Sequence, residues 1–260
     1  MKIMVCLKQV PHQDARLDVD PSGVWIQESN IKFEINSYDT YALEEALQIK
    51  DKGDAEVFVV SVGPERVTQA LRTALGMGAD RAVHVKDPAV EGSDPLGLAK
   101  VLAAVAKAEQ PDLVFAGLMS DDANYSAIPP MLAELLGMPH TTAAVKVERS
   151  GDKLVVDREI EGGANEVVEL QTPCVVAVQT GINQVRYASL KGIMAAKKKP
   201  LDVKTVADLG LEGQVGAAAA KVSVVKIASP PKGDRAQILS GSTDQVVSGL
   251  IGKIKELGLL

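Results

Sequence analysis

A run of polar side chains between residues 117 and 126 has the composition of a nucleotide-binding loop. It reads Gly117-Leu118-Met119-Ser120-Asp121-Asp122-Ala123-Asn124-Tyr125-Ser126, follows the apolar segment 112–117 and precedes a helix expected over 126–136. Backbone N–H groups at the start of a helix can bind a phosphate. The Ser126 hydroxyl adds a donor, and Asp121 or Asp122 can accept from a ribose or an adenine amine. The pattern indicates a nucleotide site, with a capped, solvated loop as the alternative.

Two other segments also follow predicted strands and extend this candidate site. Residues 8–14 come after the first strand and residues 61–64 after the second. In an open parallel sheet, ligands bind outside the carboxyl ends of the strands. The sequence has no Gly-x-Gly-x-x-Gly after its first strand and no Gly-x-x-x-x-Gly-Lys-Ser/Thr. A nucleotide would therefore be held without either standard phosphate-binding fingerprint.

The remaining carboxylates, thiols and imidazoles form no catalytic or metal-binding motif. One predicted strand carries Asp157, Glu159 and Glu161. We interpret these carboxylates as keeping the strand edge soluble and not as a catalytic pair. Cys6 and Cys174 fall inside apolar strands, which predicts buried thiols rather than nucleophiles. The 3 histidines are isolated and lack zinc-ligand spacing. We predict neither a catalytic residue nor a metal site.

The elements that position these residues alternate between strand and helix over the first half of the chain. Apolar runs predict strands over 2–10, 55–63, 82–85 and 112–117, and helical periodicity predicts helices over 38–50, 64–75, 94–109 and 126–136. Such alternation is typical of right-handed βαβ units and an α/β fold with a parallel sheet.

The second half of the chain has a different pattern. Strands expected over 143–149, 153–160 and 166–170 form a β meander, and 173–180 is a further apolar strand. A helix over 190–196 leads to Lys197-Lys198-Lys199, which we expect to be a solvated helix end. Residues 201–241 include linker-like segments at 216–220 and 229–233, and an amphipathic helix is expected over 243–257.

Composition limits the class of protein. The chain has 260 residues, is 46% hydrophobic and 3% aromatic, and carries a net charge of −6, which argues against nucleic acid as a general partner. No run reaches the roughly 18 apolar residues of a membrane span, and the N-terminus reads as a strand rather than a signal peptide. The 2 cysteines provide no disulfide framework. A cytoplasmic protein is expected.

Several longer motifs together resemble one family. The strongest are Asp157-Arg158-Glu159-Ile160-Glu161-Gly162-Gly163, Asn183-Gln184-Val185-Arg186-Tyr187-Ala188-Ser189-Leu190 and Ile193-Met194-Ala195-Ala196-Lys197-Lys198-Lys199, supported by 5–11, 35–46 and 71–81. With these motifs the chain resembles the β subunit of the electron transfer flavoproteins over nearly its whole length.

The resemblance implies a fold, cofactors and partners. The fold would be a Rossmann-like parallel sheet, adenine-nucleotide-binding and similar to universal stress proteins, over 1–200, with an added β meander and an extended C-terminal arm over 201–260 that contacts an α subunit. The heterodimer would share one FAD, and the β subunit would bury a structural AMP. Electrons would come from acyl-CoA dehydrogenases and pass to a membrane quinone oxidoreductase, so the chain would be a carrier and not an enzyme.

The resemblance also implies three sets of site residues. The AMP contacts would be Cys6, Asn36, Ser37, Tyr38, Asp39, Val62, Met119, Ser120, Asp121, Asp122, Ala123, Asn124, Tyr125 and Ser126. The residues near the FAD would be His12, Gln13, Tyr38 and Glu159. The partner-docking residues would be Arg186, Tyr187, Leu190, Ile193, Met194 and Lys197, with Leu190 as the apolar anchor.

Two alternatives to this function remain at the level of sequence. In the first, the subunit belongs to the electron-bifurcating branch, holds a second FAD in place of AMP and oxidises NADH. Residues 37–41 resemble that branch, whereas the loop 121–126 is closer to the AMP type even though Tyr125 and Ala127 replace the family's Gln and Gly. In the second, the chain is a universal-stress-type regulatory domain, which would need neither the arm nor the 186–190 segment.

Overall fold

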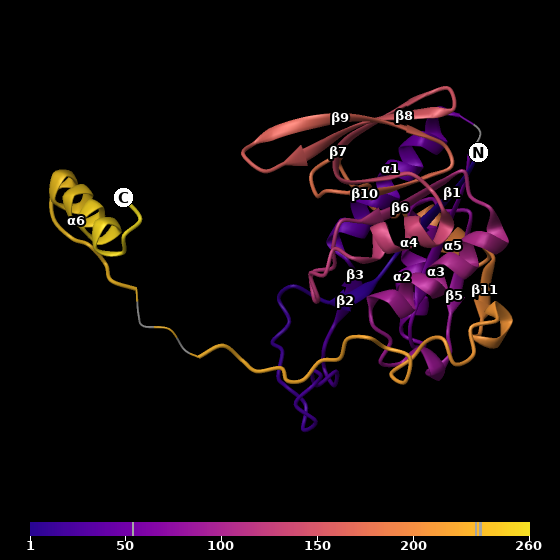
Figure 1. Cartoon of the computed structure of the whole chain (residues 1–260), viewed down its shortest axis with the longest axis horizontal. Coiled ribbons are helices and arrows are strands. Elements are labelled where there is room, and N and C mark those ends of the chain that lie inside the picture. The colour runs from indigo at the N-terminus through magenta and orange to yellow at the C-terminus, as the bar shows by residue number, and fades with distance from the viewer. Residues whose placement is uncertain (54, 232, 234–235) are drawn as a thin grey trace.

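A sheet with the strand order β11-β5-β4-β1-β6-β10-β7-β8-β9 lies at the centre of the protein (Figure 1). The computed structural model describes residues 1–53, 55–231, 233 and 236–260. The strands from β11 to β7 pair in parallel, and β8 and β9 add to β7 in antiparallel fashion. The strands are β1 Lys2–Cys6, β4 Glu56–Val62, β5 Arg81–Val85, β6 Leu113–Gly117, β7 His140–Ser150, β8 Lys153–Ile160, β9 Ala164–Gln171, β10 Cys174–Val178 and β11 Leu201–Lys204. The predicted Rossmann-like α/β fold with its meander is confirmed.

Helices cover both faces of this sheet. One face packs against α1 (Ser37–Lys52), α2 (Val67–Met77) and α5 (Leu190–Ala196), and the other against α3 (Pro95–Glu109) and α4 (Ile128–Leu136). Short 3-10 turns at Pro88–Val90 and Ala207–Leu209 complete the connections. Since aliphatic side chains from the sheet fill both cores, the strands read as continuous apolar runs, as expected for a parallel sheet buried on two sides.

The first predicted strand is divided in the structure. Residues 2–10 form β1 and then β2 (Gln9–Pro11), which pairs with β3 (Phe33–Ile35) in a separate two-stranded ribbon. The break falls at Lys8, whose N–H donates to the carboxylate of Asp39 at 2.7 Å instead of to a neighbouring strand. The chain therefore leaves the sheet just where the candidate site begins.

The order of the strands creates a switch point beside β1. The chain first builds outward from β1 through β4 and β5, and then crosses back over α3 to place β6 on the other side of β1. The carboxyl ends of β1 and β6 consequently diverge into connections that run in opposite directions. This is the place where open α/β sheets bind ligands.

The chain after residue 200 begins as part of the body and ends away from it. Strand β11 pairs with β5 although it lies beyond the predicted boundary at 200, and Val206, Leu211 and Val215 are buried in the core under α3. Helix α6 (Thr243–Glu256) stands apart from the sheet in Figure 1. Positions 232, 234 and 235 of the predicted arm, including one in the linker-like segment 229–233, lie outside the described residues.

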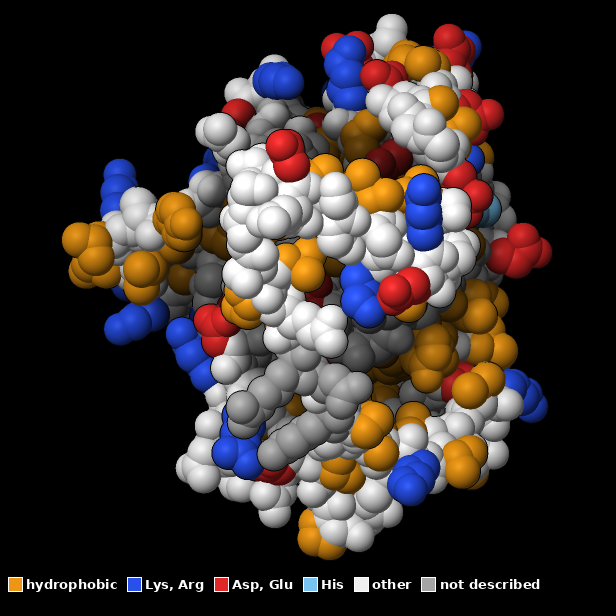
Figure 2. All heavy atoms as spheres, turned by 90° about the vertical axis from the view of Figure 1, so that its left-hand side faces the viewer, with side chains coloured by type: hydrophobic (Ala, Val, Ile, Leu, Met, Phe, Trp, Pro, Cys, Tyr) orange, Lys and Arg blue, Asp and Glu red, His pale blue; other side chains and the backbone are white. Residues whose placement is uncertain are grey.

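Helix α6 has well-formed ends but no buried residue. Ser242 and Gln245 form a capping box at its start, which stabilises the first turn without tertiary contacts. Its apolar side chains, including Val247, Leu250 and Ile251, are exposed. Seen from the side of α6, the surface carries exposed hydrophobic side chains beside Lys and Arg (Figure 2).

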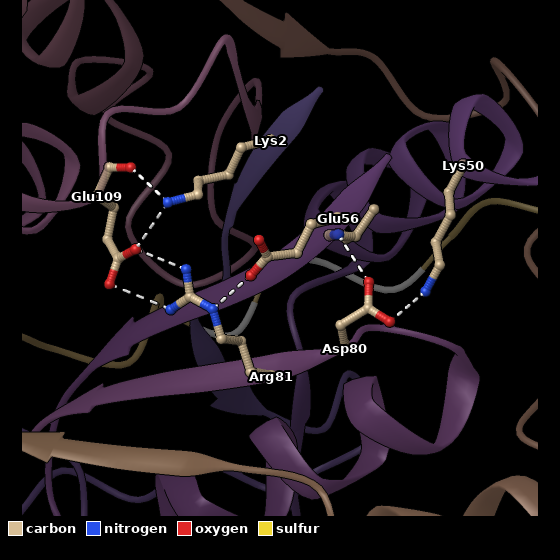
Figure 3. Close-up of polar contacts among 7 residues, drawn as sticks. Lys2, Lys50, Glu56, Asp80, Arg81 and Glu109 are labelled. Atoms are coloured by element: carbon tan, nitrogen blue, oxygen red, sulfur yellow. Dashed lines mark hydrogen bonds and ion pairs between the residues drawn. The ribbon is translucent and has the colours of Figure 1, made fainter. Parts of the chain in front are cut away.

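A network of charged side chains fixes the opposite, amino-terminal edge of the sheet (Figure 3). The Arg81 guanidinium bonds the carboxylates of Glu56 and Glu109 and lies over the Phe58 ring at 4.3 Å from its centroid. Lys2 adds a bond to the backbone oxygen of Glu109 at 2.7 Å. These contacts tie β1, β4, β5 and α3 together, so this edge serves the stability of the sheet while the other edge carries the candidate site.

Candidate functional site

A buried carboxylate occupies the switch point between β1 and β6. Asp39 lies in the first turn of α1, and its two oxygens accept the N–H groups of Lys8 at 2.7 Å and Gly117 at 3.0 Å. Burial raises the pKa of Asp39 to about 7, although both N–H bonds act in the opposite direction. A Cβ at Gly117 would collide with this carboxylate and with Tyr38, so glycine is what allows α1 to approach the end of β6.

The loop predicted to bind a nucleotide folds against the same end of α1. The Asn36 side chain donates to the backbone oxygen of Met119 and accepts the N–H of Asp121, both at 2.9 Å. The Asp121 carboxylate accepts the backbone N–H of Ser37 at 2.9 Å and its hydroxyl at 2.8 Å. The structure thus brings together residues that are about 85 positions apart in the sequence.

Lys8 provides the main cation of this cluster. Its Nζ lies 2.6 Å from the Asp122 carboxylate and 3.3 Å from the Ser120 hydroxyl. The Lys8 ammonium thus pairs with Asp122, while the Asp39 carboxylate is bound by the backbone N–H of Lys8. Lys8 lies in the segment 8–14 that the sequence analysis placed at the candidate site, although it was not named among the individual contact residues.

The other predicted AMP contacts make fewer hydrogen bonds to these residues. Cys6 is buried at the end of β1, and burial raises the pKa of its thiol. Val62 ends β4, Ala123 is half-buried, and Tyr125 is exposed to 55% of its surface. Asn124 and Ser126 both adopt a left-handed backbone conformation, with φ of 52° and 50°.

The residues predicted to face the FAD come from three separate segments. His12 follows β2 and lies between the carboxylates of Asp14, at 3.8 Å, and Glu34, at 3.5 Å. The N–H of the neighbouring Gln13 also donates to Glu34, at 3.1 Å. Tyr38 is half-buried in the first turn of α1. These side chains are reachable from outside the chain, as a site shared with another subunit requires.

Glu159 and the ribbon β2–β3 are positioned by residues that the sequence analysis missed. The Glu159 carboxylate accepts from the Gln179 amide at 3.2 Å, one residue beyond the end of β10. The Arg66 guanidinium lies over the Phe33 ring at 3.9 Å and donates to the Gln9 side chain at 2.7 Å. Nothing in the local pattern marks Gln179 or Arg66, because their partners are distant in the sequence.

Helix α5 and the segment before it are fastened to α1 by an ion pair. Arg186 donates to Glu44 from its backbone N–H at 3.1 Å and from its guanidinium at 2.8 and 2.9 Å. The Glu44 side chain is only 4% exposed. Hydrogen bonds to Glu44 and Asp51 raise the pKa of the Arg186 guanidinium.

The other end of α5 is fastened to α2. Arg72 donates to the backbone oxygens of Ala196 at 2.6 Å and Lys199 at 2.9 Å, and the Lys199 ammonium donates to those of Leu75 and Ala79. The expectation that the whole lysine run is solvated is therefore wrong for Lys199, whose charge caps α2.

A glycine contact brings α5 close to α2. A Cβ at Gly192 would collide with the backbone oxygen of Gly76, so α5 lies directly on the backbone of α2. Gly192 is a position that sequence reasoning missed, and the glycine inside a predicted helix was the available signal.

Arg186, a predicted docking residue, is part of this fixed base, and the other five predicted docking residues point outward. Tyr187 is 97% exposed, Leu190 83% and Met194 72%. Ile193 and Lys197 are also exposed. We call these five residues the α5 surface. Large apolar side chains grouped on the surface are typical of an interaction site.

The described part of the chain has neither a membrane-spanning helix nor a metal-binding cluster. Within the described ranges, no helix is long and apolar enough to cross a membrane. Across that same part of the chain, no cluster of three or more His, Cys, Asp or Glu is arranged to hold a metal ion. Both cysteines are free and buried.

Comparisons with known proteins agree with one another. A family model described as the electron transfer flavoprotein domain matches residues 23–209. The electron transfer flavoprotein subunit beta of Methylophilus methylotrophus is 40% identical over 261 residues, which cover 98% of each chain. The subunit beta of Bradyrhizobium diazoefficiens is 40% identical over the full length of both chains, and that of Homo sapiens is 36% identical over 99% of this chain and 98% of its own.

Proposed function

The chain belongs to the electron transfer flavoprotein family as a β subunit, and from this premise we propose that it pairs with an α subunit and covers one side of a shared FAD. It is an electron carrier subunit. Its electrons come from acyl-CoA dehydrogenases and leave to a membrane quinone oxidoreductase. We propose a cytoplasmic location, since a reducing compartment suits two free cysteines.

The hydrogen-bonding side chains at the carboxyl end of the sheet are suited to forming part of a flavin site. His12, Gln13 and Tyr38 offer an imidazole, an amide and a phenol, which are groups that can bond the carbonyl oxygens and ring nitrogens of a flavin. When bound, FAD supplies the electron storage. The role of this chain would be to orient that group and to exclude water from one side. Glu159, whose carboxylate accepts from the Gln179 amide, would be a further contact.

The α5 surface is the observation that carries the proposal. A carrier must bind its electron donor and release it again, which calls for a small interface with a few strong contacts. Leu190 and Tyr187 are almost fully exposed, yet the segment that bears them is fixed by Arg186, Arg72 and Lys199. A preformed apolar surface of this kind binds without the cost of ordering a loop.

Substitution of Leu190 tests this assignment in the heterodimer. Leu190→Ala removes about 2 kcal/mol of burial energy from the interface, at about 0.8 kcal/mol per CH₂, and should lower kcat/KM for reduction by an acyl-CoA dehydrogenase about 30-fold. FAD content should not change. Val203→Ala, at an exposed position on β11, is the matched control. Loss of FAD from the Leu190 variant, or unchanged reduction, would contradict the docking role.

The choice among the adenine nucleotides is a separate question. The AMP and the second FAD of the bifurcating alternative both stay predictions, and absence of NADH-driven flavin reduction would argue against bifurcation. The family match favours either over a universal-stress-type regulatory domain. The residues that would hold AMP or the second FAD are considered next.

A further inference from the structure

The start of α1 is already bound by a carboxylate from the same chain. Asp121 accepts both the backbone N–H and the hydroxyl of Ser37, with one oxygen for each. Two oxygens of a phosphate group would make the same pair of bonds at the start of a helix. Asn36 has its amide N–H and its carbonyl oxygen engaged by Met119 and Asp121. The donors of Ser37 and Asn36 are therefore taken by partners within the chain.

The start of α4 offers a phosphate fewer N–H donors than the start of most helices does. The first four N–H groups of a helix have no partner within it and are the ones that bind anions. In α4 these belong to residues 127–130, and Pro129 and Pro130 have no N–H. Ala127 precedes the helix and provides no side-chain bond. Only the N–H groups of 127 and 128 and the Ser126 hydroxyl remain there.

The charge of the cluster also disfavours a phosphate. Asp121 and Asp122 are adjacent acidic residues of the loop, and Lys8 contributes a cation to it. Its ammonium is already 2.6 Å from Asp122. A phosphate would bring up to two further negative charges to a place where carboxylates are in excess.

From these three observations we infer that the chain closes its adenine-nucleotide site with its own side chains. Asp121 takes the position of phosphate oxygens at α1 and ties the loop 119–122 to that helix, which is the structural role expected of AMP. The heterodimer then carries one FAD and no adenylate at this edge. The residues present do not fit an AMP or the diphosphate of a second FAD.

Nucleotide analysis of the purified heterodimer tests the inference. Acid extraction followed by chromatography should give one FAD and less than a tenth of an equivalent of AMP per heterodimer. Titration with AMP up to 1 mM should then show no binding, which covers AMP that was lost during purification. One AMP, or a second FAD, per heterodimer would overturn the inference. A preparation without flavin or α subunit would instead count against the proposed function.

A gain-of-binding variant tests which residues close the site. The double substitution Asp121→Ser with Pro129→Ala removes a carboxylate and restores an N–H within a helix, so affinity for AMP should rise at least tenfold. Asp202→Ser, at an exposed position on β11, is the control and should bind no AMP. If the double variant keeps its FAD and still binds no AMP, the roles given to Asp121 and Pro129 are refuted.

Discussion

The ion pair between Arg186 and Glu44 allows a quantitative test of how the α5 surface is held. Glu44 is buried and receives three bonds from Arg186, whose side chain is 32% exposed. Removing one partner of a buried pair leaves an uncompensated charge and costs about 3–5 kcal/mol. Because Arg186 is partly exposed, we take the lower end, and expect Arg186→Met to cost about 3 kcal/mol.

The thermal unfolding of the heterodimer measures this cost. In a chain of this size, 1 kcal/mol corresponds to about 2–4 °C, so Arg186→Met should lower the transition by about 6–12 °C. Glu44→Gln combined with Arg186→Met should recover much of that loss, since the buried charge is then gone. Lys253→Met breaks an exposed pair with Glu256 in α6 and should change the transition by less than about 2 °C.

A second readout connects this pair to function. Arg186 is adjacent to Tyr187, so its loss should also slow reduction by the dehydrogenase while FAD content stays the same. The reasoning fails if Arg186→Met melts like the unmodified protein. It also fails if the double variant loses as much stability as the two single variants added together, because the two residues would then not be coupled.

Three further predictions concern α5, the switch point and the arm. Gly192→Ala places a Cβ against the Gly76 oxygen, so it should lower the free energy of unfolding by about 1–3 kcal/mol and slow reduction by the dehydrogenase. Gly53→Ala, with open space around it, is the control and should leave the rate unchanged. Equal rates for the two variants would contradict the contact. The pKa of Asp39 is raised to about 7, so protonation of this group favours the folded state. Its contribution to stability is complete below about pH 4 and is lost as pH rises through 7. The free energy of unfolding measured from pH 4 to 8 should therefore fall less steeply with pH in Asp39→Asn than in the unmodified protein, and identical slopes would refute the assignment. A chain ending at Val222 should stay folded by circular dichroism but separate from the α subunit in size-exclusion chromatography, and a retained heterodimer would show that the arm is dispensable.

The main features of the fold follow from the sequence because they depend on local patterns. Apolar runs of strand length alternating with helical periodicity predict a parallel sheet covered by helices, and that sheet is found. Strand β11 was not predicted, because Leu201–Lys204 is short and most of its side chains are exposed at the sheet edge. Its position depends on pairing with β5, and the four residues of β11 contain no pattern that predicts this pairing.

In the candidate site, too, the features that depend on local sequence were predictable and those that depend on distant contacts were not. The rule that ligand loops follow strand ends was enough to single out the loop 119–126, and the structure places its first half against α1. Which donor meets which acceptor was not predictable. Asp121 was expected to accept from a ligand and instead accepts from Ser37, a residue 84 positions away in the sequence. The effect of Pro129 and Pro130 was available in the sequence, since proline never supplies an N–H.

Under the proposed function, the two exposed apolar regions suit two different kinds of binding. The α5 surface is fixed from both ends by Arg186, Arg72 and Lys199, so it meets a partner in one conformation and can release it without unfolding. Helix α6 is formed in advance by its capping box and is joined to the body through the C-terminal arm. A tether of this kind keeps the helix at a high effective concentration near a partner already bound to the body, so dissociation requires both contacts to break. The fixed surface therefore suits the transient electron donor, and the tethered helix suits the permanent α subunit.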